Sequence, residues 1–209
     1  YKKFEKIFGE LLMENDIIEI KYAMDTFYFL ISGVLVMWMA AGFTMLEAGL
    51  VRSKNTTEIL AKNVALYSIA CVMYLIMGYT VMYGGISNLY VPDGFFGISA
   101  ANSTAEEVLA SGGDTYYSGA SDFFFQVVFV ATAMSIVSGA VAERMKLWAF
   151  LAFAVVMTGF IYPMQGSWSW GGGFLGENIG YSDYAGSGIV HLCGAVAALA
   201  GVPILGPRI

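Results

Sequence analysis

The chain of 209 residues is too apolar and too poor in charge for an ordinary soluble domain. Hydrophobic residues make up 58% of it and charged residues only 12%, about half of the share that soluble domains carry. The formal net charge is -6 and the ten basic residues are scattered, so the composition excludes a basic nucleic-acid-binding surface and predicts a protein embedded in a lipid bilayer.

Residues 1–22 are expected to form an N-terminal amphipathic segment ahead of the membrane domain. Phe4, Ile7 and Leu11 recur at helical spacing, while acidic and basic residues are mixed on the other face. Such a helix would lie on the membrane surface or pack against a partner. Residues 23–209 are expected to form the membrane domain itself.

Five apolar stretches in the membrane domain are long enough to cross a bilayer as helices. They are expected at about residues 26–49, 64–83, 123–142, 147–162 and from Asp183 towards Arg208. Small residues recur every four positions at Ala131, Ser135 and Gly139, a pattern that lets a neighbouring helix approach closely. The sequence therefore predicts an all-α, polytopic membrane helix bundle with five transmembrane helices.

The basic residues near these stretches predict the orientation of the chain. They gather at the first connection, at the third connection and after the fifth span: Arg52, Lys54, Lys62, Arg144, Lys146 and Arg208. The loop of residues 86–118 contains several acids and no lysine or arginine. Because basic connections stay in the cytoplasm, the N-terminus is expected outside the cell, in a protein of the plasma membrane. Glu47, about one turn ahead of Arg52, is expected to pair with it near the headgroups.

His191 is the only histidine of the chain, and it lies within the fifth apolar stretch. About 12 Å of helix would separate it from Asp183, which places the imidazole deep in the bilayer. There the ring would either bond to a neighbouring helix or line a pore as a proton or substrate relay, and a haem site is disfavoured because no second histidine exists. Cys71 and Cys193 are expected to be buried thiols, and no metal or cofactor is expected.

Four further residues are candidates for a site at the ends of the spans. Asp183 precedes the small residues that open the fifth helix, so it is expected to cap free backbone N–H groups and also to attract cations. Phe125 and Phe129 share one helix face, as core packing or as part of an aromatic cage. Trp170 is expected at the outer mouth, as an interfacial anchor or as a further ring of that cage.

Several motifs, in chain order, resemble those of ammonium transporters of the Amt/Mep/Rh family. They are Gly42-Phe-Thr-Met-Leu-Glu-Ala-Gly-Leu-Val-Arg-Ser-Lys-Asn55 with Lys62-Asn63, Phe125-Gln126-x-x-Phe129, Ala140-Val-Ala-Glu-Arg144, Trp170-Gly-Gly-Gly173, Asp183-Tyr-Ala-Gly-Ser-x-x-Val-His191-x-x-Gly194 and Gly206-Pro-Arg208. The resemblance implies an eleven-helix, usually trimeric fold with a pore through each subunit. The chain is expected to hold the first five of these helices, as the N-terminal half of the transporter domain.

The resemblance also implies a function, with ammonium or ammonia as the substrate and no enzymatic activity. The residues expected to carry it match the family's motif positions: recruitment by Trp170, Phe125 and Phe129, a gate at Phe129, a pore relay at His191, and structural roles near the site for Asp183 and Gln126. The expected partners are the lipid bilayer, further copies in a homotrimer and a cytoplasmic regulatory protein. Two alternatives remain open: an ammonium sensor coupled to a signalling domain, and a partial transporter that does not conduct.

The predicted orientation is tested with a cysteine placed in the acidic loop, in Ser103→Cys. With the N-terminus outside, a membrane-impermeant thiol reagent should label this variant in intact cells, because the loop would face the medium. Ser53→Cys, in the basic first connection, is the matched control and should react only after lysis. The opposite pattern of labelling would reverse the topology.

Overall fold

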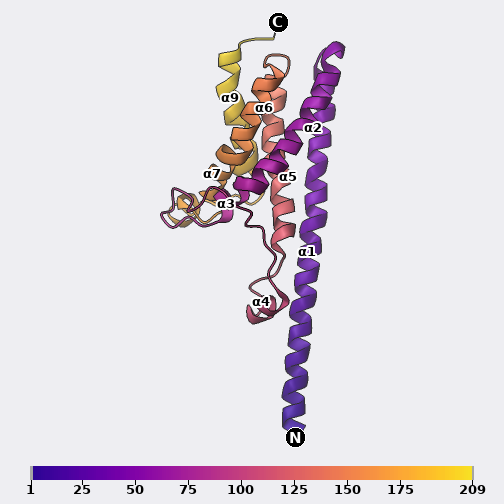
Figure 1. The fold of residues 1–209 in the computed structure, drawn as a ribbon, viewed down its shortest axis with the longest axis vertical. Coiled ribbons are helices and arrows are strands. Elements are labelled where there is room, and N and C mark those ends of the chain that lie inside the picture. Colours follow the sequence, from indigo (N-terminus) through magenta and orange to yellow (C-terminus); the bar gives the residue numbers. More distant parts are fainter. Residues whose placement is uncertain (1, 209) are drawn as a thin grey trace. The chain divides into compact units, whose positions relative to one another are not determined.

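The computed structural model describes the backbone of residues 2–208 and the side chains of residues 12–208. Within that range every regular element is a helix (Figure 1). Five helical stretches are long and apolar enough to cross a membrane: Leu12–Leu50, Ser53–Tyr83, Gly119–Val141, Leu147–Ser167 and Ser187–Leu205. The prediction of an all-α membrane protein with five spans is confirmed.

The helices divide between two compact units of the chain. In chain order they are α1 (Lys2–Leu50), α2 (Thr56–Met73), α3 (Tyr79–Tyr83), α4 (Ala105–Ala110), α5 (Gly119–Val141), α6 (Leu147–Val156), α7 (Tyr162–Ser167), α8 (Phe174–Glu177) and α9 (Cys193–Leu205). A 3-10 turn, η1 (Ser53–Asn55), and three π-helical segments, η2 (Tyr74–Gly78), η3 (Met157–Ile161) and η4 (Ser187–Leu192), join them. The first unit holds Tyr1–Val34 and Ala100–Phe125, and the second holds Leu35–Ser99 and Gln126–Ile209.

In the first unit, α1 runs without a break through the boundary that separates the predicted amphipathic segment from the first span. No glycine or proline lies between Gly9 and Gly33 to interrupt it. The side chains of residues 1–11 lie outside the described residues, so the amphipathic pattern stays a prediction. Further along, Thr26 Oγ1 accepts a hydrogen bond from Ser118 N at 3.0 Å, which ties α1 to the start of α5.

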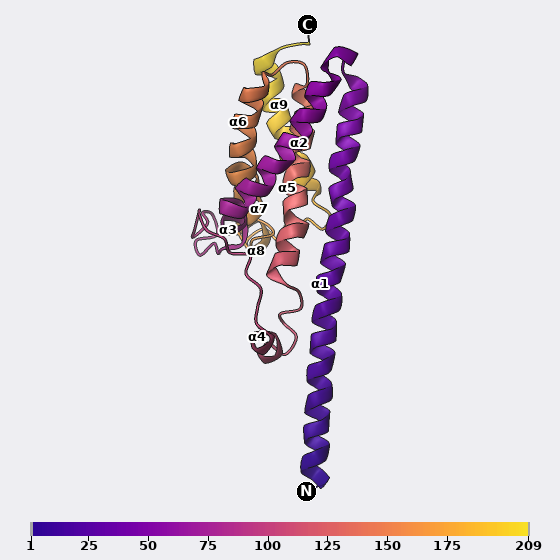
Figure 2. The same ribbon diagram turned by 45° about the vertical axis from the view of Figure 1, so that its right-hand side comes forward.

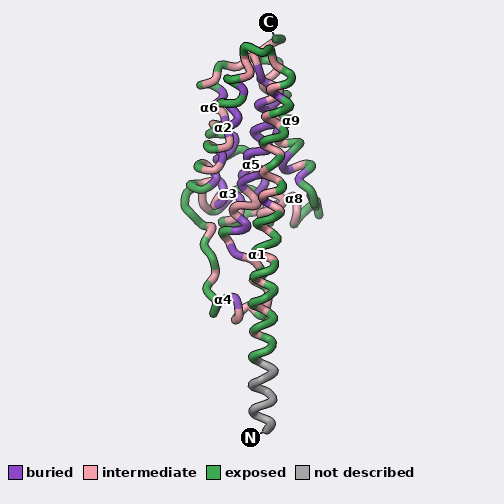
Figure 3. Tube along the Cα trace, turned by 90° about the vertical axis from the view of Figure 1, so that its right-hand side faces the viewer, coloured by how far each residue is buried: buried purple, intermediate pink, exposed green. Residues whose placement is uncertain are grey.

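In the second unit, α5 is the helix around which the others are arranged, and its buried stretch appears purple in Figure 3. Its side chains at Val128, Ala131 and Met134 are at most 1% exposed. Around it, α2 packs against α6, and α3 packs against α7 (Figure 2). Gly194 of α9 approaches α5 so closely that a Cβ atom there would lie 2.7 Å from Ala133 O. Only glycine permits this contact, which agrees with the close-packing role predicted for small residues.

The π-helical segments have no side-chain pattern of their own in the sequence, and one of them, η3, explains how the fourth span continues past a residue that breaks helices. The fourth span continues to Ser167, although its end was predicted near Tyr162. Pro163 lies in the first turn of α7, directly after η3. Proline lacks an N–H group, and the wider π turn before it absorbs the break in the hydrogen-bond ladder. The segments η2 and η3 also pack against each other, with Gly159 close to the side chain of Met77.

The predicted ion pair between Glu47 and Arg52 is wrong. Glu47 is only 2% exposed, and its Oε2 accepts from Lys62 Nζ at 3.2 Å and from Ser138 Oγ at 2.8 Å. Lys62 also donates to Ser138 O at 3.1 Å and lies over the ring of Phe150, 5.0 Å from its centroid. Each buried charge alone would cost several kcal/mol, so the two are tolerated only as a pair. The pair joins α1, α2 and α5.

Arg52 pairs instead with Glu143, at the end of the second unit where α2 and α6 begin, here called the Arg52 end. Its Nε and its backbone N donate to Glu143 Oε1 at 3.0 and 3.1 Å, and Asn55 Nδ2 donates to the same oxygen. Glu143 has a φ of 61°, a left-handed conformation that follows the end of α5 and is costly for any residue with a Cβ. Hydrogen bonds from the side chains of Arg52 and Asn55 lower the pKa of Glu143 to about 2.

Glu143→Gln should remove an acid sensitivity from this end. Because the pKa of Glu143 falls from its ordinary 4.5 to about 2 in the folded chain, its carboxylate contributes stability that is fully present above pH 4.5 and lost as the pH falls through about 2. The thermal unfolding temperature in detergent should therefore fall across this window by less in Glu143→Gln than in the parent. Glu19→Gln, at an exposed position of α1, is the control and should behave as the parent. Identical profiles for parent and Glu143→Gln would contradict the assignment.

Candidate functional site

The candidate site lies at the end of the second unit where α3 and α7 finish, here called the Trp170 end. Two long connections meet there, one after α3 and one after α7 (Figure 1). Phe174 N donates to Leu89 O at 2.9 Å, and Trp168 Nε1 donates to Tyr90 O at 2.8 Å. The rings of Tyr90 and Phe174 stack with their centroids 5.0 Å apart. These contacts hold the loops that precede the fifth span.

Asp183 organises the start of the fifth span. Its Oδ1 accepts from the backbone N–H groups of Gly186 and Ser187, both at 2.9 Å, and its Oδ2 accepts from those of Gly188 at 2.8 Å and Ile189 at 2.7 Å. Both oxygens of the carboxyl group thus accept hydrogen bonds from N–H groups at the start of the helix. The negative charge of the carboxylate is also favourable at a helix N-terminus. The capping contacts predicted for Asp183 are present.

Trp170 is hydrogen-bonded to the backbone carbonyl of the same aspartate. Its Nε1 donates to Asp183 O at 2.7 Å, and its ring meets that of Phe129 edge to face, with centroids 6.3 Å apart. Gly186 makes room beside them, since a Cβ atom there would lie 3.4 Å from the Trp170 ring and 2.7 Å from Val190. Its φ of 81° also requires glycine. The half-buried tryptophan is therefore held in one orientation.

The first turn of the fifth span is π-helical, and His191 lies within it. Val190 N and His191 N both donate to Gly186 O, at 2.8 and 3.1 Å. The carbonyl of Ile189 is taken by Gln165 Nε2 of α7 at 2.7 Å, so the widened turn is supported by a side chain from the neighbouring helix. The His191 side chain is exposed at the surface of this chain. The prediction that it faces inward as a pore relay stays a prediction.

An open groove of about 760 Å³ runs along α6, α7 and α9. Its walls are mostly apolar and include Phe153, Phe160, Leu192 and Val196, with Gln165 as a polar member. Leu192 lines the groove, whereas His191, its neighbour in the chain, is not among the lining residues.

The remaining predicted aromatic residue lies in the other unit. Phe125 packs edge to face against Phe29, with ring centroids 5.2 Å apart. Gln126, the residue at which α5 enters the second unit, is half-buried. Of the three rings predicted to act together, the second unit brings together Phe129 and Trp170.

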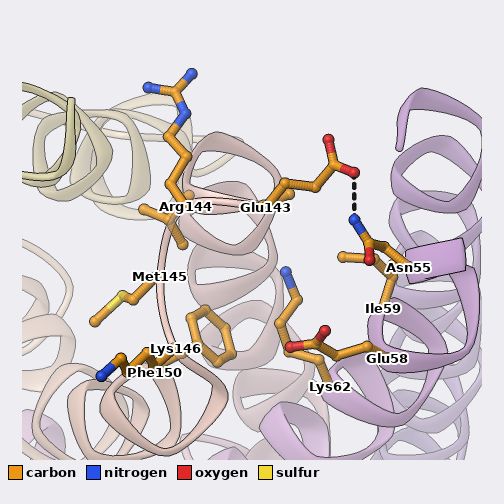
Figure 4. A pocket seen from close by; sticks show the side chains of 11 residues that line it. Asn55, Glu58, Ile59, Lys62, Glu143, Arg144, Met145, Lys146 and Phe150 are labelled. Carbon is orange, nitrogen blue, oxygen red and sulfur yellow. Dashed lines mark hydrogen bonds between the residues drawn. The ribbon is translucent and has the colours of Figure 1, made fainter. Parts of the chain in front are cut away.

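A second, partly open space of about 260 Å³ lies at the Arg52 end, and Figure 4 shows the side chains around it. Asn55 points across to Glu143, with which it shares a hydrogen bond, and Arg144 points away (Figure 4). Lys62 contributes to its wall but is already paired with Glu47. Two of the charged side chains around this cavity, Lys62 and Glu143, therefore have an oppositely charged partner within the protein. Among the described residues no group of histidine, cysteine and acidic side chains is arranged to hold a metal ion.

Gln165 is the residue of the site that sequence reasoning missed. The available signal was an uncharged amide in an apolar helix, three residues after Tyr162 and two after Pro163. Such a side chain has to find a partner within the protein, because lipid offers none. Lys62 and Asn63, the partners of Glu47, precede the second predicted span at residues 64–83, although the observed span Ser53–Tyr83 includes them.

Comparison with known proteins finds relatives that all belong to one group, the ammonium transporter (Amt) proteins. A Synechocystis sp. protein is 44% identical over 195 residues, which make up 93% of this chain and 42% of the relative. The ammonium transporter Amt2 of Archaeoglobus fulgidus is 39% identical over 211 residues, covering 96% of this chain and 42% of its own length. The solved structure of a sensor Amt protein matches with a TM-score of 0.79 and 29% identity, over 91% of this chain and 46% of that one.

These matches agree with the helical fold described above. The chain spans about 42% of the length of the two curated relatives. The matching family model describes ammonium transporters, which are not enzymes. Because the model of the Ammonium Transporter Family matches residues 27–209, the chain belongs to the ammonium transporter family and is an integral membrane protein.

Proposed function

We propose that the protein recruits ammonium at the Trp170 end and lets ammonia cross the membrane past His191. The observation that carries this proposal is the pairing of Trp170 with Phe129, with Trp170 held by its hydrogen bond to Asp183 O. Two rings fixed beside a helix start that is capped by an acid offer a surface that attracts a small cation. Family membership supports ammonium as that cation.

Energies decide which species crosses. Each aromatic face supplies about 0.5–2 kcal/mol of attraction to a cation. Carrying a bare cation through a low-dielectric interior costs tens of kcal/mol in the Born limit. The rings are therefore strong enough to recruit ammonium at the mouth and far too weak to carry it through. Ammonium gives up its proton to water at the outer mouth near Phe129, and neutral ammonia passes His191 and takes up a proton from water at the Arg52 end.

Each residue of the site then has a separate task in this proposal. Trp170 and Phe125 recruit the cation, and Phe129 recruits it and also acts as a gate. His191 is the polar relay in the apolar path. Asp183 and Gln126 are structural residues near the site, and the four hydrogen bonds of Asp183 to backbone N–H groups support that role for it.

The proposal also includes a setting for the protein. Its N-terminus lies outside the plasma membrane, so that the Trp170 end faces the medium and the basic Arg52 end faces the cytoplasm. The subunit assembles as a homotrimer, and a cytoplasmic regulatory protein acts on the Arg52 end. The distribution of basic residues and membership of the family support this setting.

An ammonium sensor is the second candidate, and the likeness to a solved sensor Amt protein favours it. A sensor needs the same recruitment of a cation at the Trp170 end but no net flux of substrate. Uptake of ammonium by the protein in cells that lack their own transporters separates the two functions. Growth on low ammonium supports transport, whereas binding without uptake supports sensing.

Trp170→Leu and His191→Ala should impair different steps of transport. Trp170→Leu should weaken uptake mainly at low ammonium, with about two- to thirtyfold more substrate needed, because a cation–π contact of this size is lost. Raising the ammonium concentration should restore most of the flux. Trp148→Leu is the matched control, since this exposed tryptophan lies at the first turn of α6, near the Arg52 end.

His191→Ala should lower the maximal flux at every ammonium concentration, or change the charge moved with each substrate, because it removes the polar edge from the apolar path. Concentration-dependent uptake and membrane current, measured on both variants, separate this behaviour from that of Trp170→Leu. If His191→Ala transports like the parent at all concentrations and with the same charge movement, His191 is a packing residue and the relay assignment fails.

Asp183→Asn should lower the stability of the folded protein, whatever its effect on transport. The amide can accept at only one of its two side-chain atoms, so two of the backbone N–H groups that bind Asp183 lose their acceptor. An unsatisfied buried donor costs about 1–3 kcal/mol. Thermal unfolding in detergent measures the loss, with Ser182→Ala at an exposed neighbouring position as the control. Equal unfolding temperatures for parent and Asp183→Asn would contradict the capping role.

A further inference from the structure

A second cavity at the Arg52 end, here called the Glu47 cavity, lies between the last turns of α1 and α5. It has a volume of about 240 Å³, and its lining includes Leu46, Glu47, Ser135, Gly139 and Arg208. It is separate from the cavity of Figure 4, which Lys62 and Phe150 line, and from the groove along α9. Nothing in the proposed transport path uses it.

One oxygen of Glu47 is left without a partner beside this cavity. The other oxygen, Oε2, accepts from Lys62, Asn63 and Ser138. Among the side chains that the structure describes, none donates to Oε1, although this atom is buried. A Cβ atom on Gly139 would lie 4.0 Å from Oε1, so the oxygen lies next to the wall that Gly139 forms. A buried carboxylate oxygen that receives no hydrogen bond from the protein is costly, so this atom is available as an acceptor for a bound group.

The surroundings of the cavity favour a positive charge. The helices α1 and α5 end there, at Leu50 and Val141, so two helix C-termini with their partial negative charge meet at one place. The carbonyls of Leu50 and Gly139 face Arg208, whose Nη1 and Nη2 lie 3.4 and 3.5 Å away. Lys62 already neutralises Glu47, and the guanidinium of Arg208 balances the two helix ends.

Arg208 is held loosely in this position. Both of its contacts lie at the long limit of hydrogen bonding, and its side chain is exposed. Its guanidinium can therefore leave without breaking a strong interaction, and its departure leaves two carbonyl oxygens and Glu47 Oε1 facing the cavity. Ser135 adds a hydroxyl oxygen, since its hydrogen is donated to Ala131 O at 3.0 Å. The site then offers only acceptors.

We propose that the Glu47 cavity binds a small monovalent cation that carries N–H donors, of the ammonium class, and that Arg208 is its tethered competitor. The identity of the cation rests on the proposed function. Ammonium has four donors, and the cavity presents acceptors from Glu47, Ser135, Leu50 and Gly139. With Arg208 in place the cavity excludes a second cation, and with Arg208 withdrawn it accepts one.

The test measures access of a cation to the cavity. In the full chain, reconstituted in liposomes and carrying Cys71→Ala and Cys193→Ala, Ala140→Cys places a thiol in the cavity wall. Its modification by the cationic reagent 2-aminoethyl methanethiosulfonate is compared with that by a neutral methanethiosulfonate. Arg208→Ala should raise the rate with the cationic reagent by about tenfold relative to the neutral one, and ammonium chloride should slow it again. Ala149→Cys, at an exposed position of α6 outside the cavity, is the control and should respond to neither change.

Two further variants assign the effect to Glu47. Glu47→Gln combined with Lys62→Met removes both charges, because either change alone would leave an unpaired buried charge. Protection by ammonium should be lost in this double variant. Ser135→Ala leaves the pair intact and should raise the ammonium concentration needed for protection by about threefold, the effect of one hydrogen bond. It keeps the test decisive if the double variant does not fold.

Several results would overturn the proposal. Protection by sodium chloride as strong as by ammonium chloride would mean ordinary screening, and no protection by any salt would mean that the cavity holds water alone. Protection by potassium without protection by ammonium would exclude the ammonium class. The readout does not depend on transport. Protection without ammonium uptake would leave this site standing and refute the proposed function, and uptake without protection would do the reverse.

Discussion

A polar group that is buried in a bilayer has to find its partner inside the protein, and this constraint shapes both ends of the second unit. At the Trp170 end the carboxylate of Asp183 takes the backbone N–H groups that open the fifth span. At the Arg52 end the carboxylate of Glu47 forms an ion pair with Lys62 of α2. It also accepts a hydrogen bond from Ser138 of α5, which lies 91 residues from Glu47 in the chain. Each buried acid joins segments that apolar packing alone would leave free to slide, since side chains in lipid gain little from meeting one another.

Features that depend on local pattern could be predicted from the sequence, and those that depend on which helix faces meet could not. The five spans follow from apolar runs, and the capping by Asp183 follows from its place before small residues. The partner of Glu47 could not be predicted from local pattern, because Arg52 is near Glu47 in the sequence whereas Lys62 is near it in space. The π-helical segments left only an indirect sign, Pro163 within an apolar run, since a shift of hydrogen-bond register has no side-chain pattern of its own.

The candidate site shows the same division. The motifs identified Trp170 and Phe129, which the structure brings together, because the resemblance carried spatial information that spacing along one helix lacks. Helical spacing placed Phe125 and Phe129 on one face but did not reveal that the ring of Phe125 meets Phe29. Gln165 was overlooked because an isolated amide has no repeat and no charge, although its bond to Ile189 O supports the widened turn that holds His191.

Asp183 has two kinds of contact, and together they couple the proposed recruitment site to the start of the fifth span. Its carbonyl oxygen accepts from Trp170 Nε1, and its carboxylate accepts from the N–H groups up to Ile189. The position of the tryptophan ring relative to η4 is therefore set by hydrogen bonds to one residue, which are directional, rather than by apolar packing, which is not. A shift of Asp183 would move the ring and the helix start together. In the proposed mechanism, an ammonium ion that binds to the ring would therefore stay at a constant distance from the turn that bears His191.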